Sequence, residues 1–170
     1  MSDALARSEP VSAQFYSGAG ISLSLAAPMA RYSLRARQPE RLEQLLEFEL
    51  PRKIGAITRG TACLGPDEWL LRGPVGMAVE TGTGLPVSVS EISDRSVCLL
   101  VEGPRAADVL AAGCPLDLDR FAVGRATRTV FEEVEIILLH TSDDSFEVEV
   151  WRSFAPWLKT ALETAARQLR

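Results

Sequence analysis

The most constraining feature of this 170-residue chain is a strand-turn-strand-helix pattern near its end. Apolar residues alternate with polar ones along 134–140 and again along 146–150, on either side of a polar turn at 142–145. This period of two predicts an antiparallel hairpin with one buried face. Apolar residues then recur at three- and four-residue spacing along 154–169, which predicts a helix capped by Ser153 and packed on the sheet.

The same reasoning locates the other elements and the fold class. Alternation or a short apolar run marks each strand, and proline marks the start of two helices. We expect strands at 21–25, 31–37, 61–64, 68–72 and 97–101, a helix from Pro39 that Pro51 stops, and a helix from Pro104 that ends with Gly113 in a left-handed conformation. Strands and helices do not alternate strictly, so we predict an α+β fold with mostly antiparallel sheets.

The chain length favours one domain rather than several. Residues 1–20 are rich in Ser, Ala and Gly and lack periodicity, so we expect a flexible N-terminal arm there. Residues 21–170 are expected to form a single domain of two closely packed halves, approximately 21–90 and 91–170. The composition, with 46% hydrophobic and 24% charged residues, is that of an ordinary globular protein.

Charge and composition argue against two classes of partner. The net charge of −5 gives no basic footprint for nucleic acid. The densest basic group is Arg31, Arg35 and Arg37, which would share one face of a strand. No apolar stretch approaches a membrane span or the core of a signal peptide. With an odd number of cysteines and no close pair, the chain is expected to be cytoplasmic.

The residues best suited to catalysis or metal binding are a single histidine and three cysteines. His140 could act as a general base or a metal ligand, but we expect a partly exposed residue at a strand end. Cys63, Cys98 and Cys114 have no partner at metal or redox spacing, and we interpret them as packing residues. We therefore assign no catalytic, cofactor-binding or metal-binding residue.

The remaining polar and aromatic motifs also favour structural interpretations. Three acidic pairs are expected to face solvent on turns and strands, namely Glu132–Glu133, Asp143–Asp144 and Glu147 with Glu149. The glycine-rich stretch 81–84 lacks the lysine of a phosphate-binding loop, and 103–105 is expected to be a turn rather than an anion site. Trp69, Trp151 and Trp157 are interpreted as core residues more than as a cofactor platform, with Trp151 the best candidate for a partner contact.

Several segments, in order and spacing, resemble one known family, the gamma subunit of heterotetrameric sarcosine oxidase. They extend over most of the chain after Gly20. These segments are Leu64–Leu71 (LGPDEWLL), Ile92–Val97 (ISDRSV), Val101–Ala106 (VEGPRA), Val109–Leu118 (VLAAGCPLDL) and Arg152–Leu158 (RSFAPWL). The resemblance implies a fold related to the folate-binding domain of glycine-cleavage T proteins.

The resemblance also implies a function. The complex demethylates sarcosine oxidatively to glycine, with formaldehyde or methylene-tetrahydrofolate and hydrogen peroxide as further products. Its alpha and beta subunits hold NAD, FAD and FMN, its delta subunit holds zinc, and the gamma subunit is a non-catalytic accessory. Two alternatives stay open: a subunit of a related N-methyl amino acid oxidase or dehydrogenase, and a free-standing folate-binding one-carbon protein. The short chain disfavours the latter.

Overall fold

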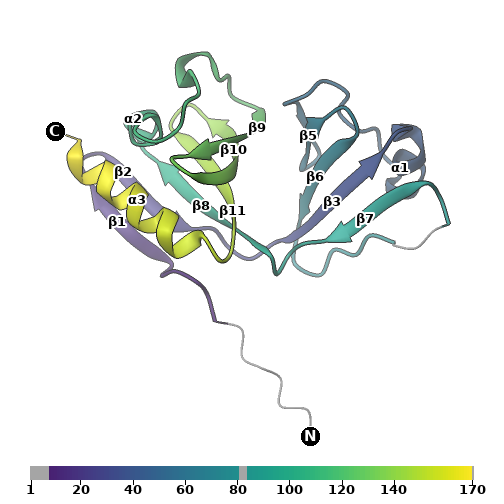
Figure 1. Ribbon diagram of the computed structural model, residues 1–170, viewed down its shortest axis with the longest axis horizontal. Coiled ribbons are helices and arrows are strands. Elements are labelled where there is room, and N and C mark those ends of the chain that lie inside the picture. Colours follow the sequence, from purple (N-terminus) through teal and green to yellow (C-terminus); the bar gives the residue numbers. More distant parts are fainter. Residues whose placement is uncertain (1–7, 81–83, 170) are drawn as a thin grey trace, which may run out of the picture.

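The computed structural model describes residues 8–80 and 84–169, which form two antiparallel sheets with helices on their outer sides (Figure 1). Sheet A has the strand order β1 (Gln14–Gly18), β2 (Ile21–Leu25), β8 (Ser96–Glu102), β11 (Ser145–Trp151), β10 (Val134–Ser142) and β9 (Arg125–Phe131). Sheet B has the order β4 (Ile57–Thr58), β5 (Thr61–Gly65), β6 (Glu68–Gly73), β3 (Ala30–Ala36) and β7 (Val87–Glu91). The helices are α1 (Pro39–Leu46), α2 (Ala106–Ala111) and α3 (Ala155–Gln168), with a 3₁₀ turn, η1, at Leu118–Arg120.

Sheet A buries one face against α2 and α3. The alternation along β10 and β11 directs Ile136, Leu138 and Val148 to this face, where they are buried. Leu158 and Leu162 of α3 complete the same core, because residues four apart lie on one side of a helix. This core accounts for most of the buried apolar side chains in the described part of the chain.

Sheet B buries its own outer face against α1. Leu34 and Trp69 are register partners on β3 and β6, and both pack with Leu42 of the helix. The Trp69 indole donates a hydrogen bond of 2.8 Å from Nε1 to the carbonyl of Pro51. A buried indole N–H needs such a partner, so the contact also holds the segment after α1 against the sheet.

The inner faces of the two sheets approach each other, with a small apolar contact on one side. Ala62 of β5, Ala126 of β9 and Leu139 of β10 are all buried in this contact. An isolated β-bridge between Ala56 and Arg125 also joins the two sheets. Elsewhere the facing surfaces carry polar and charged side chains, and these surround the cleft described below.

The predicted fold class is confirmed, because every strand pairing in both sheets is antiparallel. The predicted strand 21–25 coincides with β2, and the hairpins predicted around 65–67 and 142–145 are β5–β6 and β10–β11. The sequence analysis missed β7 and β9, whose burial is partial.

The N-terminal boundary is corrected. Gln14–Gly18 form edge strand β1, paired with β2, although we expected 1–20 to be a flexible arm; residues 1–7 lie outside the described residues. β2 in turn pairs with β8, so sheet A draws strands from both of the predicted halves. The chain crosses from sheet A to sheet B after Leu25. The close packing of two halves stays a prediction.

The helix boundaries also differ from those expected. α1 ends at Leu46 rather than near Pro51, because Glu47 adopts a left-handed conformation with φ of 59°. α2 begins at Ala106, beyond Pro104, and Gly113 is not left-handed. Gly113 is instead packed against the Phe131 ring, where an added Cβ would lie 2.7 Å from the ring.

The start of α3 differs as well. The N-cap residue is Phe154, and Ser153 forms no side-chain cap. Leu158, Leu162 and Ala165 pack on sheet A as predicted, but Phe154 and Trp157 are exposed. The predicted apolar stripe is therefore buried only in part.

Candidate functional site: the cleft between the sheets

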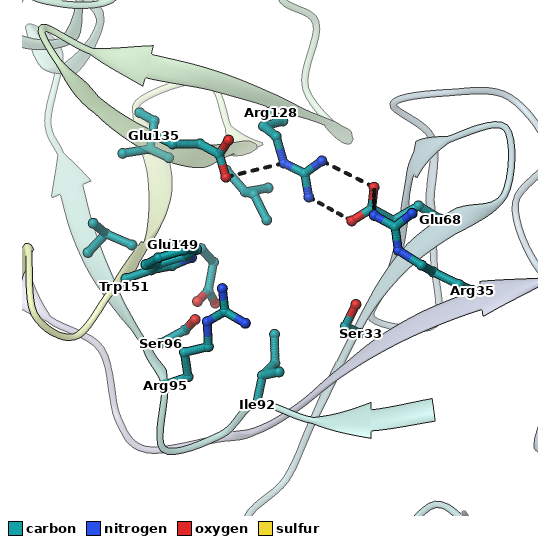
Figure 2. Close-up of a pocket in the computed structure, with 13 residues that line it drawn as sticks. Ser33, Arg35, Glu68, Ile92, Arg95, Ser96, Arg128, Glu135, Glu149 and Trp151 are labelled. Atoms are coloured by element: carbon teal, nitrogen blue, oxygen red, sulfur yellow. Dashed lines mark hydrogen bonds and ion pairs between the residues drawn. The ribbon is translucent and has the colours of Figure 1, made fainter. Parts of the chain in front are cut away.

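Sheets A and B face each other across an open cleft of about 320 Å³ (Figure 2). Alternation along each strand directs its polar side chains to this cleft, because the apolar ones occupy the opposite face. The polar and aromatic lining residues are Ser33, Arg35, Glu68, Arg95, Ser96, Arg128, Glu135, Glu149 and Trp151. The cleft is thus lined mainly by charged groups from strands that are distant in sequence.

A buried ion-pair network centred on Glu149 of β11 lies next to the cleft. The side chains of Glu149 and Arg31 are only 3% and 4% exposed, and Arg31 Nε donates to Glu149 Oε2 at 2.7 Å. Arg31 lies directly opposite Arg72 in the β3–β6 register. Two like charges in register repel each other, and Glu149 offsets this repulsion by also accepting from Arg72 Nη1 at 3.3 Å.

Arg72 makes a second ion pair, with Glu147 of β11. Burial by itself would lower the pKa of Arg72, but Glu149 and Glu147 outweigh it and raise that pKa. Arg31 and Arg72 belong to sheet B, whereas Glu147 and Glu149 belong to sheet A. The network therefore joins the two sheets through charge-assisted hydrogen bonds.

A second group of ion pairs spans the cleft between β3 and β6 of sheet B and β9 and β10 of sheet A (Figure 2). Arg128 of β9 binds Glu68 of β6 through both terminal nitrogens, at 2.7 and 3.1 Å. Arg35 of β3 lies 3.1 Å from Glu68, and Arg128 Nε lies 3.5 Å from Glu135. The hydrogen bond from Arg128 is the main reason that the pKa of Glu68 is lowered, so Glu68 stays ionised at neutral pH.

Arg95 and Trp151 form one rim of the cleft. The guanidinium carbon of Arg95 lies 4.0 Å from the centre of the Trp151 ring, which is a cation–π contact. In Figure 2 the indole lies above Arg95, with Ser96 and Ile92 beside them. The sequence analysis identified Trp151 as a partner-contact candidate but did not identify Arg95.

Two predictions about charged residues are corrected or refined here. Glu147 and Glu149 were expected to face solvent, whereas Glu149 is buried and Glu147 is half-buried between the sheets. Arg31 and Arg35 do share a face of β3, but this face is turned toward sheet A. Alternating polarity along a strand shows which residues share a face. It does not show whether a second sheet covers that face, because such a contact leaves no pattern among neighbouring residues.

His140 lies on the opposite face of sheet A from the cleft. It is 8% exposed rather than partly exposed, since its ring stacks on Phe146 at 4.2 Å between centroids and on Phe121 at 6.0 Å. Its Nδ1 lies 2.5 Å from the Phe121 carbonyl, and Nε2 is buried without a hydrogen-bond partner among the described residues. Among the described residues, His140 makes its hydrogen bond and ring contacts with Phe121 and Phe146 and none with an acid or a thiol.

All three cysteines are buried free thiols, as predicted. Cys98 lies beside Glu149 in the β8–β11 register. Burial raises the pKa of Cys98 well above its ordinary value, and the neighbouring Glu149 raises it further. Burial likewise raises the pKa of Cys63, although a hydrogen bond to the Gly65 carbonyl acts against it.

We expect these thiols to resist alkylation in the folded chain, even at mildly alkaline pH. Reaction requires a thiolate in contact with the reagent, and a raised pKa keeps the proton on Cys98 as the pH passes its ordinary value. A thiol-exchange reagent should detect three thiols after denaturation and almost none before it. Rapid reaction that disappears in a Cys98→Ser variant would contradict this expectation.

The other sequence candidates lie apart from the cleft. Glu132, Glu133, Asp143 and Asp144 are exposed on hairpin turns, as predicted. The segment 103–105 forms the turn between β8 and α2, and 81–83 of the glycine-rich stretch lie outside the described residues. Trp69 is a core residue as predicted, whereas Trp151 and Trp157 are exposed.

The described residues contain neither a cluster of metal ligands nor a membrane-spanning helix. Within residues 8–80 and 84–169, no three His, Cys, Asp or Glu side chains gather closely enough to hold a metal ion. In the same ranges, every helix is too short or too polar to cross a bilayer.

Comparison with known proteins identifies the family. The sequence model described as "Sarcosine oxidase, gamma subunit family" matches residues 38–168. This chain belongs to the sarcosine oxidase gamma subunit family. It is 34% identical over 129 residues to sarcosine oxidase subunit gamma of Corynebacterium sp. strain U-96, and 32% identical over 135 residues to that of strain P-1. These matches cover 66% and 70% of this chain but 63% and 66% of the two relatives, so the match spans slightly less than two thirds of their length.

Two solved structures share this fold, and the first of them agrees with the family assignment. A chain of heterotetrameric sarcosine oxidase from Corynebacterium sp. U-96, in complex with pyrrole 2-carboxylate, superposes with a TM-score of 0.72 at 28% identity. That match covers 90% of this gamma-family chain and 89% of the other. Aminomethyltransferase T of the glycine cleavage system from Bartonella henselae superposes with a TM-score of 0.63 at 19% identity, covering 85% of this chain and 45% of that one, which confirms the predicted fold relationship.

Proposed function

We propose that this chain is a non-catalytic accessory subunit of a heterotetrameric sarcosine oxidase. Such a complex demethylates sarcosine to glycine, with hydrogen peroxide and either formaldehyde or methylene-tetrahydrofolate as further products. The observation that carries the proposal is the match over nearly the whole length of both chains between this fold and a chain of the Corynebacterium heterotetramer. The sequence match to the gamma subunit family over residues 38–168 supports the same role.

The charges of the cleft support an accessory role rather than a catalytic one. Among the described residues, each carboxylate that lines the cleft is engaged by arginine: Glu68 by two, Glu149 by two and Glu135 by one. A general acid must be able to hold its proton near neutral pH, whereas the hydrogen bond from Arg128 lowers the pKa of Glu68. The same pairing leaves no lining carboxylate free to bind a pterin ring.

Under this proposal the chemistry belongs to the other subunits. Alpha, beta and delta subunits are the partners, and they hold FAD, FMN, NAD and zinc and use tetrahydrofolate. The chain itself contributes no catalytic, cofactor-binding or metal-binding residue, and the complex functions in the cytoplasm. Two closely packed halves that both contribute strands to sheet A would give this subunit a rigid surface for assembly.

The proposal predicts a specific spectroscopic result. The chain purified by itself should be colourless, whereas the same chain co-expressed with the oxidase subunits of its source organism should co-purify with flavin absorbance. Titration of the isolated chain with tetrahydrofolate should show no micromolar binding. A flavin spectrum or micromolar folate binding by the isolated chain would contradict the accessory assignment.

A further inference from the structure

Three exposed aromatic side chains lie within seven residues of one another in the sequence, where β11 leads into α3. Trp151, Phe154 and Trp157 are 44%, 44% and 41% exposed, and the rings of Trp151 and Phe154 are 6.1 Å apart. The other large apolar side chains that are exposed in the described residues are aliphatic and widely separated in sequence, namely Ile54, Val75, Val123 and Val130. Clustered exposed aromatics mark interaction surfaces more often than single ones do.

These aromatic rings are not needed for the core of sheet A. Leu158, Leu162 and Ala165 supply the face of α3 that is buried on the sheet. Phe154 precedes the helix and Trp157 lies in its first turn, and both are exposed, so they lie outside that buried face. Their exposure costs solvation free energy in the free chain, and burial against another protein would remove this cost.

Arg95 adds a charge beside Trp151. Its guanidinium lies over the Trp151 ring at 4.0 Å. No carboxylate among the described residues pairs with it, whereas Arg35 and Arg128 of the same cleft both bind Glu68. A surface that covers Trp151 would also remove water from Arg95, so it must offer a carboxylate to avoid burying an unpaired charge.

The backbone holds these groups in place before any partner binds. Arg152 N donates to the Arg95 carbonyl at 2.8 Å, and Phe154 N donates to the Trp151 carbonyl at 2.9 Å. The first bond fixes the loop before β8 against the end of β11, and the second closes the turn from β11 into α3. Less conformational entropy is then lost on binding, which favours a tight interface.

We propose that Arg95, Trp151, Phe154 and Trp157, here named the aromatic corner, dock onto a partner protein that presents a carboxylate surrounded by apolar side chains. The carboxylate binds the Arg95 guanidinium, and the apolar side chains cover the three rings. Trp and Arg are the residue types that most often dominate the affinity of protein interfaces. This inference rests on the proposed function, since it gives the accessory subunit its contact with the flavin-carrying subunits.

The test compares variants of the full chain in assembly with the oxidase subunits of its source organism. Trp151→Ala and Arg95→Glu should each weaken assembly by roughly 30-fold or more, as measured by binding of the flavin-carrying subunits to immobilised chain. Val123→Ala, at a position with a similar exposed fraction of 46%, should leave binding within about twofold. Circular dichroism and thermal unfolding of each variant confirm that the chain is folded.

The outcomes separate this inference from the proposed function. If the unsubstituted chain binds the flavoprotein subunits but Trp151→Ala and Arg95→Glu bind equally well, the aromatic corner is not the interface and the proposed function stands. If the unsubstituted chain does not bind them, the proposed function fails. Self-association of the isolated chain that Trp151→Ala abolishes would show a second copy to be the occupant, and would overturn the inference.

Discussion

Replacing Glu149 by alanine is expected to lower the free energy of unfolding by about 3–5 kcal/mol. The carboxylate is buried and accepts from Arg31 at 2.7 Å and Arg72 at 3.3 Å. Its removal leaves the buried Arg31 side chain with the Met29 carbonyl, at 3.2 Å, as its one remaining hydrogen-bond partner among the described residues. It also leaves two like charges in register without their shared counter-charge. Urea unfolding followed by circular dichroism measures the effect.

Two further variants show whether the loss arises from the broken charge network. Glu147→Ala should cost less, roughly 1–3 kcal/mol, because Glu147 is half-buried and Arg72 keeps its contact with Glu149. The fourfold variant Arg31→Met, Arg72→Met, Glu147→Gln, Glu149→Leu should recover most of the stability, because uncharged groups of similar volume can replace a buried ion-pair network at little cost. A Glu149→Ala loss below about 1 kcal/mol would contradict the burial of this network.

Gly103→Ala is the second substitution with a large expected effect. Gly103 directly follows β8 and has a φ of +121°. A Cβ added there would lie 2.0 Å from the carbonyl oxygen of Gly20. The neighbour is backbone, so it cannot move aside without displacing the β1–β2 turn. Backbone strain of about 1–3 kcal/mol and a steric cost of similar size should together lower stability by roughly 3 kcal/mol or more.

Gly124→Ala provides the matched control. Gly124 also has a positive φ, +78°, but nothing lies within 4 Å of an added Cβ. The free energy of unfolding of this variant should therefore fall by about 1–2 kcal/mol, which is the cost of placing an alanine in the left-handed conformation. Comparing the urea midpoints of the two variants separates two contributions to the loss of stability. One is the steric contact with Gly20, and the other is the preference of glycine for positive φ. Equal losses would show that the contact between Gly103 and Gly20 contributes nothing.

Much of sheet A could be predicted from the sequence because its signals are local. Alternation along 134–140 and 146–150 predicted the β10–β11 hairpin and the face on which Leu138 and Val148 are buried. β9 was missed because its alternation is interrupted by partly exposed residues. β1 was missed because Gln14–Gly18 is a short segment without alternation, next to serine-, alanine- and glycine-rich sequence, and its pairing with β2 is what shows it to be a strand.

The candidate site was less predictable, because its residues come from strands far apart in the chain. Glu149 and Arg31 are 118 residues apart, and Glu68 and Arg128 are 60 apart. Arg95 lies in a loop and carries no periodic signal. Of these groups, only the shared face of Arg31 and Arg35 could be identified, from their even spacing along one strand.

The sequence by itself determined the antiparallel α+β fold, the hairpins and the resemblance to the gamma subunit family, since periodicity, turn residues and motif order are properties of neighbouring residues. Only the tertiary structure decided that the polar faces of the two sheets meet. Charged residues on an alternating strand face solvent by default, because an unpaired buried charge is costly. Arginines on sheet B and glutamates on sheet A remove that cost for each other, and this complementarity exists only once the two sheets have folded together.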